Sequence, residues 1–234
     1  MIKTWMTPWL LMAVPFLGAA LSLLLRTSLQ RMKTSALLTT VASMLVVIGT
    51  PWALGDTLAG VPFLCLLPLT AFLSLLGQPL HRDNTSAWTT TLVLLGLGLG
   101  ILTAQAPAHD VMLLVLPGLL CILLYRYQSG ATPETWRGLS AYGLSMVSAA
   151  LALVLPTPAS TVALLVTCAT LLPLLPVHSG FIATLTGLPG NLPAFLVFLL
   201  PTVGFHTLLM LLPNLTVTTL HTIAILALAG ALYG

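Results

Sequence analysis

The sequence contains very little charge. Only 5% of its 234 residues are Asp, Glu, Lys or Arg, whereas about 25% is usual in soluble domains, and 58% are hydrophobic. The mean hydropathy is +1.10. No segment has the polar composition of a soluble domain, so the composition predicts an all-α integral membrane protein embedded in the lipid bilayer. The net charge of +3 comes from residues in short connections, which does not indicate a nucleic-acid partner.

Reactive groups are also scarce. Cys65, Cys121 and Cys168 lie in apolar segments without a CxxC pair, and we expect buried thiols rather than a disulfide. The sequence has no HExxH motif, Ser-His-Asp arrangement or Cys/His ligand spacing. We therefore expect no catalytic residue, metal or cofactor, and no enzymatic activity of the chain on its own.

Apolar segments of suitable length are abundant. A transmembrane helix needs about 20 apolar residues. In this sequence, short connections separate the apolar segments. The first segment is long, contains Pro15 and leads directly to another apolar segment, so we interpret it as a span rather than a cleaved signal peptide. The sequence predicts about nine transmembrane helices in a single domain covering residues 1–234, at 8–26, 36–54, 61–77, 87–104, 110–126, 139–155, 161–177, 192–212 and 216–233.

Two of these predicted helices are rich in small residues. Gly96, Gly98 and Gly100 lack the order and context of a phosphate-binding loop. The predicted helix 139–155 carries several Ser, Gly and Ala residues, including Ser145 and Ser148. Small residues let helix backbones approach closely, so we expect tight packing at both places and a central position for the second helix.

Basic residues predict the orientation. Six of the seven Lys and Arg residues fall in the first, third and fifth connections: Arg26, Arg31, Lys33, Arg82, Arg126 and Arg137. Cytoplasmic loops of membrane proteins carry an excess of Lys and Arg. We expect an outside N-terminus and a cytoplasmic C-terminus, in a bacterial inner (plasma) membrane.

The segment 171–212 is interrupted by proline and glycine. One predicted span ends in a Pro-x-x-Pro-x-His sequence, a Gly/Pro-rich connection follows, and the next span contains another proline. Irregular backbone survives in a membrane only where it packs on protein or lines a hydrated cavity. We expect helix breaks at Pro173, Pro176, Pro189, Pro201 and Gly204.

These residues carry a resemblance to a known family. Pro173, Pro176 and His178 have the spacing of the Lys-x-Pro-x-x-Pro-x-His signature of antiporter-like subunits of respiratory complex I, Mrp antiporters and membrane-bound hydrogenases. Without a gap, Pro189 and Gly204 then match a proline and a glycine of the same family. The resemblance implies that residues 105–234 correspond to the first of the family's two inverted repeats, preceded by N-terminal helices at 1–104.

The family's buried charges are missing. The glutamate and the two lysines that move protons in this proton-conducting transporter family correspond to Leu119, Leu171 and Thr202. Leucine can neither bind nor pass a proton, and a membrane proton relay needs titratable groups. The resemblance thus implies the fold but argues against the pumping activity.

Histidines are the remaining candidates for a proton path. His206 follows Thr202 by four residues, so both lie on one face of a helix. His221, with Thr218 and Thr222, forms a second polar group that would meet His206 if the two helix faces are in contact. A neutral hydrogen-bonded histidine is the alternative for His206. A structural hinge is the alternative for His178.

Three functions remain open. The first is a non-pumping structural subunit of a larger complex, such as an NADH:quinone oxidoreductase-like or hydrogenase-like assembly, with other membrane subunits as partners. The second is a proton- or cation-conducting subunit that uses His206, His221 and water. The third is an unrelated permease or accessory membrane protein.

Overall fold

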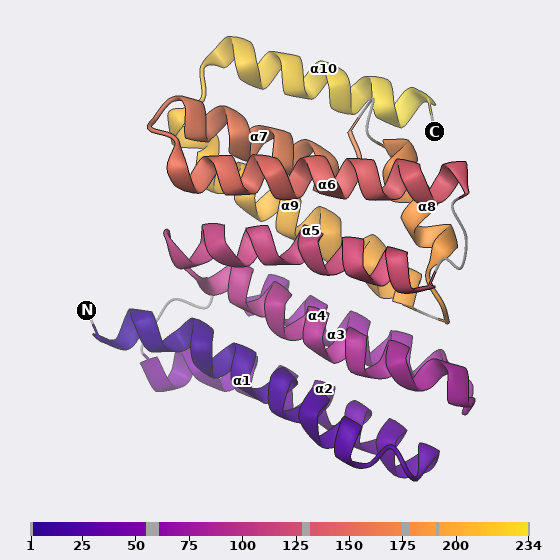
Figure 1. Ribbon diagram of the computed structural model, residues 1–234. Coiled ribbons are helices and arrows are strands. Elements are labelled where there is room, and N and C mark those ends of the chain that lie inside the picture. The colour runs from indigo at the N-terminus through magenta and orange to yellow at the C-terminus, as the bar shows by residue number, and fades with distance from the viewer. Residues whose placement is uncertain (1, 55–60, 128–131, 175–177, 191, 234) are drawn as a thin grey trace. The chain divides into compact units, whose positions relative to one another are not determined.

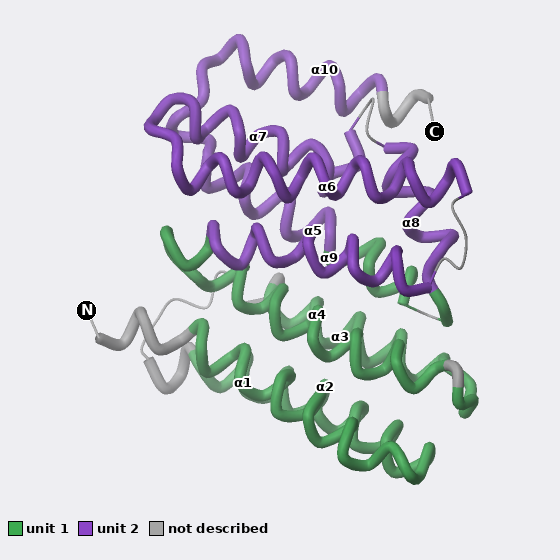
Figure 2. Tube along the Cα trace, in the orientation of Figure 1, with its two compact units in different colours: residues 1–109, 189–199 green, residues 110–188, 200–234 purple. Residues whose placement is uncertain are grey.

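The computed structural model describes residues 2–54, 61–127, 132–174, 178–190 and 192–233 (Figure 1). These residues form α-helices and short 3-10 turns, and no strand occurs among them. They divide into two compact units, 1–109 with 189–199 and 110–188 with 200–234 (Figure 2). The described part of the chain is therefore all-helical, as the composition predicted.

The first unit is built around a buried helix. It contains α1 (Ile2–Leu24), α2 (Leu29–Leu54), α3 (Val61–Gly77), the 3-10 turn η2 (Arg82–Asn84), α4 (Thr85–Thr103) and the beginning of α9 (Leu192–Leu211). Helix α4 packs against α1, α2 and α3, and most of its side chains are buried. Its apolar residues point in all directions because other helices, rather than solvent, surround it.

Glycines allow the neighbours of α4 to come close. A Cβ atom on Gly96 would lie 3.3 Å from Pro15 Cβ on α1, and one on Gly98 would lie 2.9 Å from Leu67 Cδ2 on α3. Ser22 and Thr89 also share a hydrogen bond of 3.3 Å between α1 and α4. The predicted close packing at Gly96 and Gly98 is confirmed.

One end of this unit gathers segments that are distant in sequence. Lys33 Nζ, near the start of α2, donates to the carbonyl oxygens of Leu76 (3.1 Å) and Gln78. Gly190 has a φ of +62°, and a Cβ there would meet the Gln78 side chain. The first turn of α2, the connection after α3 and residues 189–190 thus lie at the same end of the unit.

The second unit is arranged around α6. It contains α5 (Ala108–Tyr127) from residue 110, α6 (Pro133–Val154), α7 (Ala159–Leu171), α8 (His178–Gly187), the rest of α9, the 3-10 turn η3 (Leu212–Asn214) and α10 (Val217–Tyr233). Helix α6 begins at an N-cap, where the Thr132 hydroxyl accepts from the Thr135 N–H at 3.2 Å. Helices α7 and α8 both pack on α6, as expected for its central position.

Helices α7 and α8 follow each other along α6 (Figure 1). Thr167 on α7 contacts Ser148, whereas a Cβ on Gly180 of α8 would lie 3.1 Å from the Arg137 carbonyl oxygen. Ser148 and Arg137 are about 16 Å apart along α6. The 13 residues of α7 and 10 of α8 correspond to about 35 Å of helix, enough for one bilayer crossing of about 30 Å. The pair therefore has the length of a single interrupted span.

The predicted boundaries need correction here. The expected span 161–177 ends at Leu171, and the expected connection from 178 contains α8. Proline has no N–H and disfavours helix at the residue before it, so Pro173 explains why α7 ends where it does. Pro189 lies between α8 and α9, as predicted, and Pro176 lies outside the described residues.

The predicted break at Pro201 and Gly204 is wrong. Helix α9 runs without interruption from Leu192 to Leu211 with Pro201 inside it. A proline removes one backbone hydrogen bond, and membrane helices tolerate that loss where neighbouring groups replace it.

Within the described residues, five helices are long and apolar enough to cross a membrane: α2, α4, α5, α6 and α9 with the turn that follows it. The described parts of α1, α3, α7 and α10 are apolar but shorter. These helices support a membrane protein.

Candidate functional site

The three positions at which the resembled family carries buried charge all lie in the second unit. Leu119 is half-buried on α5, and Leu171 is completely buried at the end of α7. Thr202 is 9% exposed on α9. None of these three positions has an ionisable side chain. The site that the resemblance predicted is therefore formed by apolar or neutral residues.

Helix α9 meets the end of α7 in direct contact. A Cβ atom on Gly204 would lie 3.0 Å from Leu171 Cβ, 2.9 Å from Leu172 Cγ and 3.2 Å from the Leu172 backbone nitrogen. This contact leaves no space for a long side chain between the two helices. Thr202 is two residues from Gly204, which is about 200° around the helix, so it lies on the opposite face of α9.

The predicted histidines occupy three different settings. His178 is the first residue of α8, next to the interruption after α7, and is half-buried. His206 is half-buried on the Thr202 face of α9. His221 is exposed on α10, as are Thr218 and Thr222. The polar group around His221 therefore lies on an open helix surface, not in an enclosed site.

Charged groups are confined to the ends of helices. In the described helices, every Asp, Glu, Lys and Arg lies within five residues of a helix end. Among the same residues, no group of three or more His, Cys, Asp or Glu side chains could hold a metal ion. Such an arrangement offers neither a metal centre nor a row of ionisable groups across a bilayer.

Buried hydroxyl groups line the middle of α6. Ser148 Oγ lies 3.0 Å from Thr167 Oγ1, and Thr167 Oγ1 lies 3.4 Å from the Ser145 carbonyl oxygen. Tyr142 is fully buried and its hydroxyl faces Thr184 on α8, yet it forms no hydrogen bond of normal geometry with the described residues. The Ser145 hydroxyl also lacks a partner there. The small residues of α6 predicted close packing from the sequence. Nothing in the sequence indicated that the Tyr142 side chain would be buried beside them.

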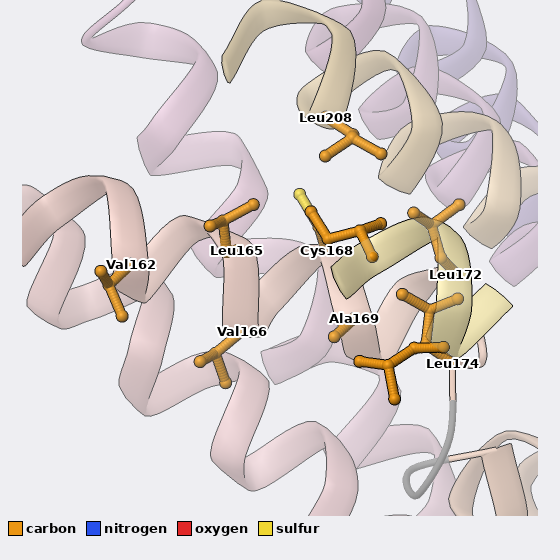
Figure 3. A pocket seen from close by; sticks show the side chains of 10 residues that line it. Val162, Leu165, Val166, Cys168, Ala169, Leu172, Leu174 and Leu208 are labelled. Atoms are coloured by element: carbon orange, nitrogen blue, oxygen red, sulfur yellow. The ribbon is translucent and has the colours of Figure 1, made fainter. Parts of the chain in front are cut away.

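An apolar pocket of about 210 Å³ lies on another side of α7 (Figure 3). Its walls come from α7, the residues that follow α7, α9 and α10, and it is partly open. In Figure 3 the Cys168 sulfur points toward Leu208. The pocket is lined by Val162, Leu165, Val166, Cys168, Ala169, Leu172, Leu174, Leu208, Ile223 and Leu226.

The sequence alone gives no sign of this pocket. Its lining residues extend from 162 to 226 and are nearly all aliphatic, so they do not differ from the residues of an ordinary membrane helix.

No protein-family model, curated protein or solved structure matches the chain.

Proposed function

We propose that the chain is a non-pumping membrane subunit of a larger respiratory or ion-translocating complex, related to antiporter-like subunits. The observation that carries this proposal is the contact between Gly204 and residues Leu171 and Leu172. Packed aliphatic groups occupy the space around Leu171. A proton relay would need a charged side chain and water at this position. The resemblance at Pro173, His178 and Pro189 supports the relation to antiporter-like subunits.

The proposed arrangement has nine crossings, with α7 and α8 together forming the seventh. Lys33 lies at the same end of the first unit as the connection after α3 and residues 189–190. These segments adjoin the first, third and seventh connections of the proposed topology, all of which are cytoplasmic in it. The agreement supports placing these three connections on one side of the membrane, and the excess of Lys and Arg in the first and third makes that side cytoplasmic in the proposal.

Copurification tests the proposal. A tagged chain extracted in mild detergent from its own membrane should bring other multi-span subunits with it in fixed proportion. A chain that is isolated alone, with no partner after crosslinking in the membrane, contradicts the subunit assignment and favours an independent permease.

Histidine variants separate the structural role from conduction. In the intact complex, His206→Ala and His221→Ala should leave proton translocation unchanged. Positions 119, 171 and 202 carry no ionisable group that could relay a proton with His206, and His221 lies on an open surface. A loss of translocation in either variant, with assembly intact, supports the conducting alternative instead.

A further inference from the structure

We propose that the pocket between α7, α9 and α10 binds the acyl chain of a bilayer lipid. The proposal rests on the membrane topology given above, because it requires α7 and α10 to lie in the bilayer. It does not depend on the chain being part of a larger complex.

The lining of the pocket selects an apolar ligand. Nine of its ten side chains are aliphatic, and the thiol of Cys168 is the single polar group among them. A polar ligand would lose its hydrogen bonds to water and gain none from these side chains, which costs free energy. An alkyl chain has no hydrogen bonds to lose.

The pocket is large enough for an apolar ligand. An apolar cavity of about 150 Å³ in a protein core stays dry and takes up benzene. The pocket here measures about 210 Å³. It cannot close by moving α9 onto α7, because Leu172, which lines it, already contacts the backbone of α9 at Gly204.

The position of the pocket favours a lipid chain as that occupant. Helix α10 covers it with Ile223 and Leu226, whereas Ile225 and Leu228 are exposed by 66% and 62%. In a membrane these exposed side chains face hydrocarbon, so acyl chains are the medium at the pocket opening. Lipid tails are as apolar as leucine and can replace the missing van der Waals contacts of the walls.

A photoreactive phospholipid tests the proposal. The purified full chain is mixed in detergent micelles with phosphatidylcholine that carries a diazirine near the end of one acyl chain, irradiated, and analysed by peptide mass spectrometry. We expect labelling to saturate and to concentrate on residues 162–174 and 223–226. Ala169→Phe, which places an aromatic ring in the pocket, should reduce this labelling severalfold.

The matched control is Val147→Phe. Val147 is 53% exposed on α6 and does not line the pocket, so this variant should be labelled like the natural chain. If Ala169→Phe is not recovered folded, competition provides the second measurement: excess unlabelled phosphatidylcholine should remove label from the pocket residues of the natural chain before it removes label from exposed Leu151.

Three results overturn the proposal. They are non-saturable labelling spread evenly over exposed helix surfaces, unchanged labelling in folded Ala169→Phe, and stronger competition by an isoprenoid quinone than by phosphatidylcholine. Because topology is measured separately with water-soluble reagents, failure here with the topology intact would reject only the lipid site.

Discussion

Ser148 Oγ on α6 and Thr167 Oγ1 on α7 lie 3.0 Å apart, and both side chains are buried. Hydrogen bonds between membrane helices contribute about 0.6 kcal/mol on average and about 1.7 kcal/mol at most. This pair holds α7 against α6. Substituting these two residues therefore measures how much their buried hydroxyl groups contribute to the free energy of unfolding of the protein.

We predict that Thr167→Val lowers the free energy of unfolding by about 1 kcal/mol. The substitution keeps the shape of the side chain but removes its hydroxyl, which leaves Ser148 with only the backbone carbonyls of its own helix. A double-mutant cycle with Ser148→Ala, measured by unfolding in mixed micelles, gives the coupling energy. Strict additivity of the two single variants would show that the pair contributes nothing.

Removing the Tyr142 hydroxyl should not destabilise the protein, in contrast to removing the Thr167 hydroxyl. The Tyr142 hydroxyl is buried and forms no hydrogen bond of normal geometry with the described residues, and an unsatisfied buried polar group costs about 1–3 kcal/mol. We therefore expect Tyr142→Phe to leave the melting temperature unchanged or to raise it, whereas Thr167→Val lowers it. A clear decrease in the melting temperature of Tyr142→Phe would mean that the hydroxyl has a partner such as a bound water.

Gly204 should not tolerate a larger residue. A Cβ there would lie within 3.2 Å of three atoms of Leu171 and Leu172, including a backbone nitrogen. Overpacking of this kind costs about 1–3 kcal/mol, so Gly204→Ala should lower thermal stability in detergent. Gly143→Ala on α6 is the matched control, because nothing lies within 4 Å of its Cβ position and alanine is the better helix former. Equal behaviour of the two variants would contradict the close approach of α9 to α7.

Restoring a lysine at position 202 should impair the protein. Thr202 is buried, and α5 has no acidic residue at position 119 to pair with a new charge. A lysine at the centre of a membrane helix costs about 2.5–3.5 kcal/mol for insertion. We expect Thr202→Lys to reduce the amount of folded protein in the membrane much more than Thr202→Val, which has a similar shape and adds no charge. Normal assembly of Thr202→Lys together with proton conductance would indicate a hydrated channel and reject the structural role.

Cysteine labelling tests the orientation. Thr27 and Leu80 lie in the proposed cytoplasmic connections, Gln105 and Thr157 in the proposed outer ones, and all four side chains are exposed. In intact cells, a membrane-impermeant maleimide should label cysteines placed at 105 and 157 and should reach 27 and 80 only after permeabilisation. The reverse pattern would invert the topology.

Much of the helical layout was predictable from the sequence. Each of the nine predicted apolar segments contains a helix, because a run of apolar residues in a chain with few charges has to satisfy its backbone internally. The predicted break at Pro173, which cannot donate a backbone hydrogen bond, agrees with the end of α7 at Leu171, although the predicted span extended to 177. The same rule failed at Pro201, where α9 continues, since one missing hydrogen bond does not determine whether a helix breaks.

By itself, the sequence determined that the chain is all-helical and apolar and that its few charges lie near helix ends. Composition and chain-local rules suffice for these properties. Only the tertiary structure decided that α7 and α8 both pack along α6, that Gly204 meets Leu171, and that α7, α9 and α10 line a partly open apolar pocket. These features depend on which faces of apolar helices meet, and leucine-rich faces resemble one another too closely for the sequence to specify their partners.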